Sequence, residues 1–207
     1  MVSHCAISDQ TRKCGETAMT EYHLHRFLDD ARQAARANPE PADCVAAVAP
    51  LMHRLLLGDR GFLKPGHFRD DPDHYARNAV HVADDGGTSL YALVWNPGQW
   101  TPVHDHGTWG VVGMVRGVLE ERNFIRGDPQ NETDAGIVLH RGGVILMTEC
   151  TVTTFVPNPD HIHRTGVDDD REQAVSLHLY GRTMNRFHVY DVAAGTRERI
   201  DVFHNES

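Results

Sequence analysis

Two histidines separated by one residue form the part of this sequence best suited to chemistry. His104 and His106 close the segment GQWTPVHDH. Residues i and i+2 of a β-strand point to the same face, so a strand here would present two imidazoles side by side. Such a pair suits Zn, Fe, Cu or Ni about equally. Two surface histidines, or a pair satisfied by hydrogen bonds, would show the same spacing, so the pair alone does not establish a metal site.

Two later segments contain further candidates. The segment PDHIHRTG contains His161 and His163, which share strand parity, so geometry alone does not decide which could be a third ligand. In the segment SLHLY, alternation places Ser176, His178 and Tyr180 on one face and the leucines on the other. A polar stripe on a half-buried strand, or a buried network without a catalytic role, would give the same pattern.

Tyr75 and Arg77 lie upstream of the first histidine pair and are also two residues apart, so they share a face in an extended chain. The planar guanidinium of arginine can donate two parallel hydrogen bonds to a carboxylate. Arg77 would therefore suit an acidic ligand, with an ordinary surface arginine as the alternative.

The composition of the 207 residues limits the classes of function. An apolar share of 40% and a charged share of 24% are ordinary for a globular protein. The net charge of −9, without a basic stripe, argues against a nucleic-acid partner. No run of apolar residues is long enough for a membrane span, so no membrane partner is expected. The 15 histidines motivate a metal hypothesis without locating a site.

Helical and β-rich segments must position these side chains. Residues 20–58 have helical periodicity with a break at Asn38, Pro39 and Pro41. Residues 59–73 are typical of a connecting loop. From residue 75 onward, short β-branched and aromatic runs alternate with turn residues, which predicts an antiparallel barrel or double-sheet sandwich. Strands are expected within 89–95, 108–115, 144–147, 151–156 and 174–180.

The expected organisation is one domain over residues 1–207: a polar leader (1–19), a helical segment (20–58) and a β-barrel (75–207) on which that segment packs. The leader lacks the apolar stretch of a secretory signal. The four cysteines are scattered without a CxxC spacing. A disulfide framework is therefore not expected, and a cytoplasmic location is.

The glycines around the first histidine pair resemble a known motif. Gly98 lies six residues before His104, and Gly117 lies eleven residues after His106. This arrangement resembles the first metal-binding motif of the cupin superfamily, whose jelly-roll-like barrel is a double-stranded β-helix. Gly110 stands where that motif often has a glutamate, so the chain lacks the carboxylate ligand of ordinary cupins.

The motifs together resemble the thiol dioxygenases, and most closely the bacterial cysteine dioxygenases (type I). The likeness runs from about Tyr75 to Asp191 and combines the histidine pair, a later histidine, the SLHLY segment and the upstream tyrosine and arginine. In this family the serine–histidine–tyrosine segment follows the third ligand with a spacing of fifteen residues to its histidine. That spacing to His178 implies His163 rather than His161 as the third ligand.

The resemblance implies a mononuclear Fe(II) held by three neutral histidines, His104, His106 and His163. Neutral ligands leave the ion its full charge, which favours binding of a thiolate. The implied reaction adds both atoms of O₂ to the sulfur of L-cysteine and gives cysteine sulfinic acid. Dioxygenation of another small thiol carboxylate, 3-mercaptopropionate or mercaptosuccinate, is the alternative.

The resemblance also implies roles for the other candidates. Arg77, assisted by the hydroxyl of Tyr75, would bind the substrate carboxylate. Tyr180 would direct its hydroxyl at the substrate and oxygen, and His178 and Ser176 would fix and polarise it.

The resemblance also bears on a covalent link. Some relatives link a cysteine to the active-site tyrosine, but Gly110 occupies that position, so no crosslink is expected. Arg182 or Arg186 could reshape the acid-binding end of the pocket and favour a dicarboxylate. The rival functions are a metal cupin of different chemistry and a non-catalytic sensor, and a monomer or a weak homo-oligomer is expected.

Overall fold

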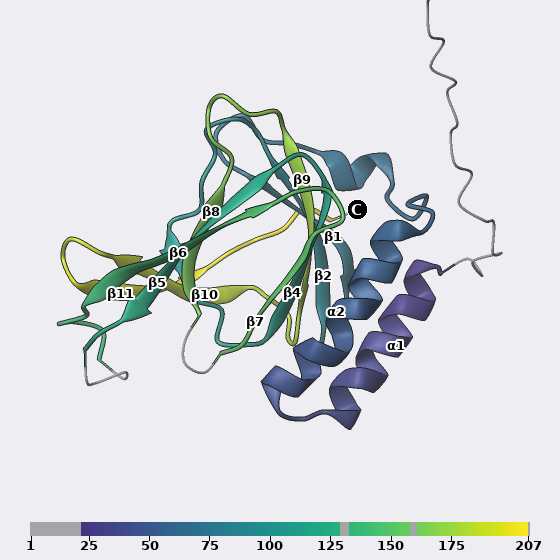
Figure 1. Cartoon of the computed structure of the whole chain (residues 1–207), viewed down its shortest axis with the longest axis horizontal. Coiled ribbons are helices and arrows are strands. Elements are labelled where there is room, and N and C mark those ends of the chain that lie inside the picture. The colour runs from purple at the N-terminus through teal and green to yellow at the C-terminus, as the bar shows by residue number, and fades with distance from the viewer. Residues whose placement is uncertain (1–21, 129–132, 158–160, 207) are drawn as a thin grey trace, which may run out of the picture.

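Two N-terminal helices pack on one face of a barrel made of two antiparallel sheets (Figure 1). The computed structural model describes residues 22–128, 133–157 and 161–206, so the predicted leader, residues 1–19, lies outside the described residues. The helices are α1 (Leu24–Ala37) and α2 (Pro41–Leu57), followed by a short 3-10 helix, η1 (Pro65–Phe68). None of the helices in the described part of the chain is long and apolar enough to cross a bilayer.

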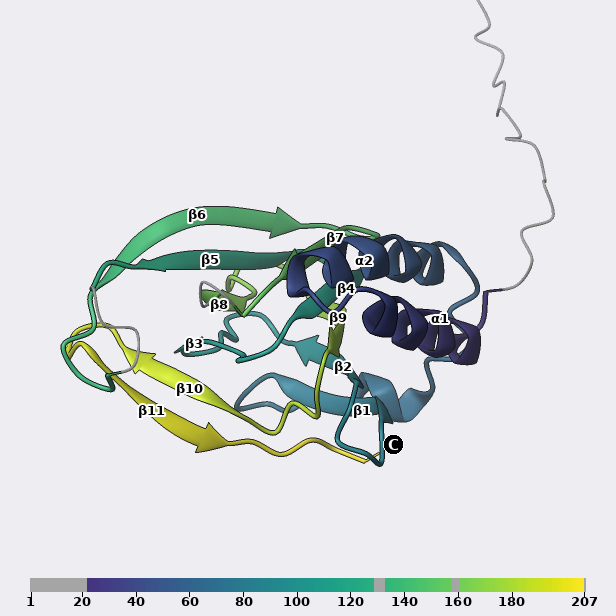
Figure 2. The same cartoon turned by 90° about the horizontal axis from the view of Figure 1, so that it is seen from below.

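The first sheet has the strand order β1-β2-β9-β4-β7, and the second has the order β11-β10-β3-β8-β5-β6. The strands of the first sheet are β1 (Ala76–Val82), β2 (Ser89–Trp95), β4 (Gly110–Arg116), β7 (Val152–Phe155) and β9 (Ala174–Tyr180). Those of the second are β3 (Val103–His104), β5 (Leu119–Arg126), β6 (Leu139–Met147), β8 (Ile162–Gly166), β10 (Arg186–Asp191) and β11 (Thr196–Asp201). Figure 2 shows three layers side by side: the helices, the first sheet and the second sheet.

The central strand β9 separates the two cores by simple alternation. Val175, Leu177 and Leu179 face the helices and belong to the cluster between the helices and the first sheet. Ser176, His178 and Tyr180 have the opposite parity and therefore face the space between the sheets. All seven residues of β9 are buried, because both faces of this strand are covered.

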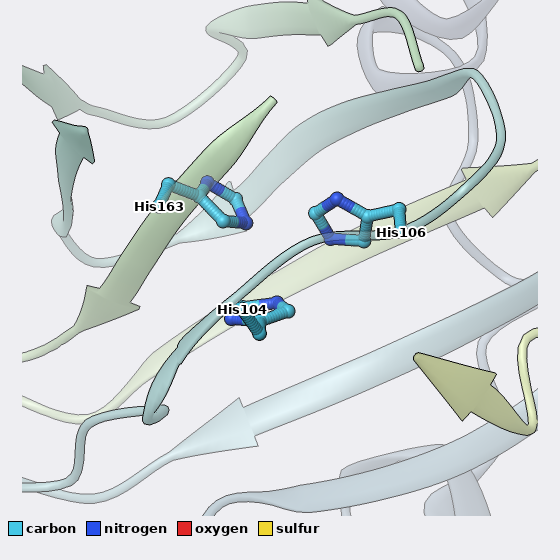
Figure 3. Close-up of side chains that lie close together, drawn as sticks. All are labelled: His104, His106 and His163. Atoms are coloured by element: carbon cyan, nitrogen blue, oxygen red, sulfur yellow. The ribbon is translucent and has the colours of Figure 1, made fainter. Parts of the chain in front are cut away.

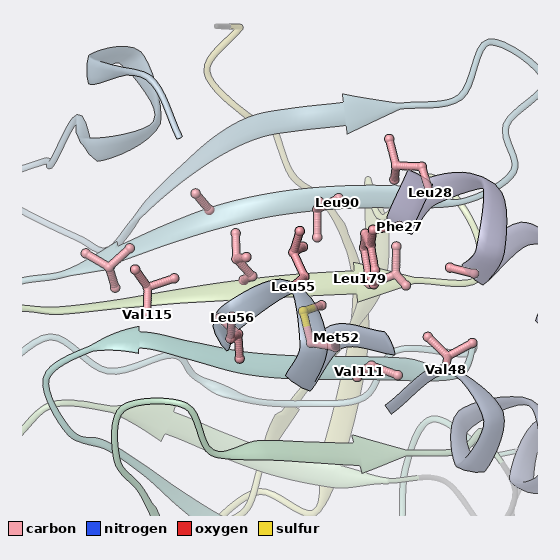
Figure 4. Packing of buried hydrophobic residues seen from close by; sticks show 14 of the residues in the cluster. Phe27, Leu28, Val48, Met52, Leu55, Leu56, Leu90, Val111, Val115 and Leu179 are labelled. Atoms are coloured by element: carbon pink, nitrogen blue, oxygen red, sulfur yellow. The ribbon is translucent and has the colours of Figure 1, made fainter. Parts of the chain in front are cut away.

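Close contact between α2 and β4 depends on a glycine. A Cβ atom at Gly113 would lie 2.8 Å from Leu56 and 2.9 Å from Met52, closer than side-chain atoms normally approach. Figure 4 shows these two side chains packed over the strands, beside Leu55 and Val111. The missing side chain at Gly113 thus lets the helix lie directly on the sheet.

The predicted architecture, a mainly β cupin-type barrel with a helical segment packed on it, is confirmed. The helical segment breaks near the expected prolines, and β2 and β9 have the expected bounds. The expected strand within 144–147 is longer, since β6 begins at Leu139, and the expected loop 59–73 contains η1. Pro50 lies inside α2, a position that local sequence preferences disfavour.

Candidate active site

Three histidine rings point toward a common space between the two sheets (Figure 3). His104 ends β3 and lies directly opposite His163 of β8 in the strand register, and His106 follows β3. One ring nitrogen from each of the three lies within 4.8 Å of the others. All three residues are buried, with exposed fractions of 7%, 4% and 2% for His104, His106 and His163. The structure therefore brings together the three residues that the motifs predict as ligands.

The histidine pair does not lie in one regular strand, as its spacing predicted. Strand β3 ends at His104, and the next two residues follow outside it. Asp105 anchors them to β10: its backbone N–H donates to the carbonyl of His188 (3.1 Å), and its Oδ2 accepts from His188 Nδ1 (3.0 Å) and the Tyr190 hydroxyl (2.9 Å). These bonds replace the strand ladder, and the rings of His104 and His106 remain neighbours, with centroids 4.8 Å apart.

The protonation of this cluster suits a metal ion. His104 Nδ1 donates to the carbonyl of Pro102 (3.0 Å), which leaves its Nε2 as a free lone pair. His106 Nδ1 and both ring nitrogens of His163 are buried and have no hydrogen-bond partner among the described residues, although His163 Nδ1 lies 3.2 Å from Glu121 Oε2. Burial, and then the neighbouring histidines, lower the pKa of His104 and of His106 well below the usual range, so both rings are neutral. Buried nitrogens without partners are costly, and a metal ion would satisfy them.

Arg77 reaches the same pocket from β1. Its side chain is nearly buried, and its guanidinium lies over the ring of Tyr91 at 4.9 Å. Nη2 donates to the carbonyl of Met184 (2.6 Å), whereas Nη1 is buried without a hydrogen-bond partner among the described residues. Tyr75 also lines the pocket and stacks on Trp95, with ring centroids 4.7 Å apart. The pocket thus holds a fixed cationic group with a donor left to bind an anion.

A chain of hydrogen bonds runs along β9 to the pocket. Trp95 Nε1 donates to Ser176 Oγ (2.9 Å), which lets the serine hydroxyl donate to His178 Nε2 (2.9 Å). His178 Nδ1 can then donate to the hydroxyl oxygen of Tyr180 (3.2 Å), leaving the tyrosine proton free to point into the pocket. Burial lowers the pKa of His178 to about 3 and raises the pKa of Tyr180, so both groups are neutral near pH 7.

Gly110 lies directly opposite Tyr180 in the strand register, and as a glycine it has no sulfur to offer that residue. A Cβ atom at Gly110 would overlap the ring of Phe155, so the aromatic ring occupies the space that a longer side chain would need. The absence of a crosslink at this position stays a prediction.

Arg182 and Arg186 do not line the pocket, where Arg77 is the one arginine among the described residues. Arg182 Nη2 instead donates to the carbonyl of His106 (2.9 Å). Arg182 therefore holds the backbone of a predicted ligand and leaves the acid-binding end to Arg77.

Two acidic residues near the histidines have no counterpart in the sequence interpretation. Glu121 of β5 contacts both His161 and His163, and Asp105, the residue between His104 and His106, is anchored to β10. His161 forms a second potential ligand group with Glu121 and His163. Glu121 could have been suspected because it is a charged residue at an inward-facing strand position, whereas the partners of Asp105 are distant in sequence.

Comparison with known proteins identifies the family. A family model of cysteine dioxygenase type I matches residues 66–193, more than half of the chain. The chain belongs to this family. The resemblance drawn from the motifs is confirmed, and so is the prediction of an enzyme of a dioxygenase family. Among curated proteins, the human "Cysteine dioxygenase type 1" is 27% identical to this chain over 138 residues. The match covers 66% of this chain and 66% of the human protein, which is just under two thirds of its length. The zebrafish (Danio rerio) protein of the same name is 25% identical over 157 residues, covering 75% and 74%.

Solved structures similar to this cysteine dioxygenase type I family chain are more distant. A cupin-like protein from Thermotoga maritima has 16% identity and a TM-score of 0.37, with 64% of this chain and 84% of that chain covered. Hydroquinone 1,2-dioxygenase from Sphingomonas sp. TTNP3 has 10% identity and a TM-score of 0.42, with 66% and 72% covered.

Proposed function

We propose that this protein is an Fe(II)-dependent thiol dioxygenase that converts L-cysteine and O₂ into cysteine sulfinic acid. The observation that carries the proposal is the set of groups lining one buried pocket: three neutral imidazoles, an arginine with a free donor and a tyrosine hydroxyl. The curated relatives, named cysteine dioxygenase type 1, support the choice of substrate.

His104, His106 and His163 would hold the iron. Bound Fe(II) supplies the redox chemistry by which O₂ reacts with a thiolate sulfur. Both atoms of O₂ become bonded to the sulfur, which is oxidised by four electrons while O₂ is reduced by four. The thiol proton is released as the sulfinate forms.

The remaining groups of the pocket bind and orient the substrate. Arg77 offers Nη1 to the carboxylate while Nη2 stays on the carbonyl of Met184, so the substrate is held without movement of the guanidinium. Tyr180 donates its proton toward the substrate, because His178 already donates to its oxygen. Apolar residues, including Leu93 and Phe187, line the pocket and exclude water.

The lining argues for a monocarboxylate. Arg77 is the one arginine at the pocket among the described residues, which disfavours mercaptosuccinate, and no carboxylate lines the pocket in that part of the chain. The described lining thus offers no carboxylate to pair with a charged ammonium, so an uncharged substrate amine is favoured. 3-Mercaptopropionate, which lacks the amine, is the remaining alternative.

The test is O₂ consumption by the Fe(II)-loaded protein with L-cysteine, 3-mercaptopropionate, mercaptosuccinate and cysteamine, with the sulfinate identified by mass spectrometry. We expect the highest kcat/KM with L-cysteine, two ¹⁸O atoms in the product from ¹⁸O₂, and poor activity with cysteamine, which has no carboxylate for Arg77. No O₂ consumption with any of the four thiols would refute a thiol dioxygenase.

A further inference from the structure

Glu121 is a buried carboxylate beside the predicted metal ligands. It lies on β5 with 2% of its surface exposed. In the register of β5 and β8 it is opposite Thr165, which makes it a diagonal neighbour of His163 on the same face. Its two oxygens contact two different histidines: Oε2 lies 3.2 Å from His163 Nδ1, and Oε1 lies 3.3 Å from His161 Nε2.

Glu121 is placed to interact with these two neighbouring imidazoles. Within the described part of the chain, both of its ion-pair contacts are to His161 and His163. An ionised carboxylate in this position can only accept hydrogen bonds.

The carboxylate oxygens favour one tautomer of each ring. A proton on His163 Nδ1 would point toward Oε2, 3.2 Å away, and would leave Nε2 as a lone pair on the other edge of the ring. In the same way, a proton on His161 Nε2 would face Oε1, 3.3 Å away. That nitrogen is then occupied by Glu121 and is not available to a metal ion.

We propose that Glu121 is the positioning residue of the metal centre: it orients His163 and supplies the negative charge that the three neutral ligands lack, and His161 holds Glu121 in place. This inference rests on the proposed metal site. It also assigns a role to His161, whose side chain is 22% exposed and reaches the carboxylate from outside the triad.

The expected size of the effect follows from the chemistry of imidazole. A carboxylate that accepts the second ring N–H makes the ligating nitrogen more basic and restricts the ring to one orientation. Loss of such a partner weakens metal binding by roughly 10- to 100-fold in general. The ligand count does not change, because Glu121 acts through His163.

The experiment measures Co(II) binding to the full-length metal-free protein by competition with a chelator. We expect Glu121→Gln to raise the Kd for Co(II) by roughly 10- to 100-fold, to keep one Co(II) per chain, and to shift the visible absorption of the bound ion. Glu120→Gln is the matched control, because Glu120 is a buried carboxylate on the same strand that pairs instead with Arg122 and Arg171. It should leave the Kd and the spectrum unchanged.

His161→Ala distinguishes the group of His104, His106 and His163 from the group of Glu121, His161 and His163. We expect it to retain one Co(II) per chain with a smaller loss of affinity than Glu121→Gln, whereas His163→Ala should lose the ion. An unchanged Kd in Glu121→Gln would overturn the proposal. Loss of Co(II) in His161→Ala with retention in His104→Ala would also overturn it, because Glu121 and His161 would then be ligands.

Two measures keep the result interpretable. The melting temperature of each metal-free variant reports folding, and Glu121→Asp replaces Glu121→Gln if the latter does not fold. The charge retained in Glu121→Asp should keep the Kd for Co(II) within about tenfold of wild type. A larger loss of affinity would contradict a role of the charge. Because the readout is metal affinity, a wild-type protein that binds Co(II) but oxidises no thiol with Fe(II) would refute the proposed function and leave this inference standing.

Discussion

Single side chains in this pocket have separable tasks, because each is held by its own neighbours. Arg77 is held by the carbonyl of Met184 and the ring of Tyr91, and Tyr180 by His178. A substitution at either position should therefore remove one function and leave the histidine cluster in place.

Arg77→Gln tests the carboxylate site. A charge-assisted hydrogen bond contributes about 1.5–3 kcal/mol, so we expect KM for L-cysteine to rise by roughly 10- to 150-fold with a smaller change in kcat. Steady-state kinetics with L-cysteine and cysteamine measure this, and the weak activity with cysteamine should not change. A loss confined to kcat would argue against binding of the carboxylate.

Tyr180→Phe tests the hydroxyl at the end of the β9 hydrogen-bond chain. Removal of a positioned proton donor typically costs 10²- to 10⁴-fold in rate, so we expect kcat to fall by roughly 10²-fold or more. Metal content should stay at one ion per chain, as measured by elemental analysis. An unchanged kcat would show that the hydroxyl takes no part in the reaction.

At the scale of elements, strand parity does most of the positioning. Strand β9 faces the helices with its apolar residues and the pocket with Ser176, His178 and Tyr180, so local alternation in the sequence was enough to predict both faces. The same reasoning wrongly continued the strand through His106, since hydrogen bonds between Asp105 and β10 shape that segment. Partners such as Glu121 and His163 are far apart in the sequence, and only the pairing of β5 with β8 makes them neighbours.

Gly110→Ala tests the packing of β4 against β7. The added Cβ would overlap the ring of Phe155, and overpacking typically costs about 1–3 kcal/mol. We expect a lower free energy of unfolding by that amount in urea denaturation. The double variant Gly110→Ala with Phe155→Leu should recover part of the loss, and equal stability of the single variant and wild type would mean that the ring moves without cost.

At the scale of the whole molecule, the proposed metal centre would join two strands of the second sheet, β3 and β8, on the side that faces the first sheet. The helices lie on the far side of the first sheet and form a separate core (Figure 2). Metal binding should thus stabilise the barrel, whose ligand-bearing segments are short.

Metal removal measures that contribution. A ligand that binds only the folded state adds about 2.7 kcal/mol at a free concentration of 100 times its Kd. We expect the melting temperature to rise with the concentration of added Co(II) in the wild-type protein and not in His104→Ala. A melting temperature that is independent of Co(II) in the wild type would mean that the three histidines bind no ion.

The burial of β9 on both faces has a consequence for how the molecule exchanges its amide protons with solvent. This strand is hydrogen-bonded to β2 on one side and to β4 on the other, whereas β3 contributes two residues to its sheet. Amides of β9 should thus exchange only through global unfolding, and those around β3 through local opening. In deuterated buffer, the backbone amides of the strand that carries Tyr180 would stay protected. Those of the strand that carries His104 would exchange as that segment opens and closes.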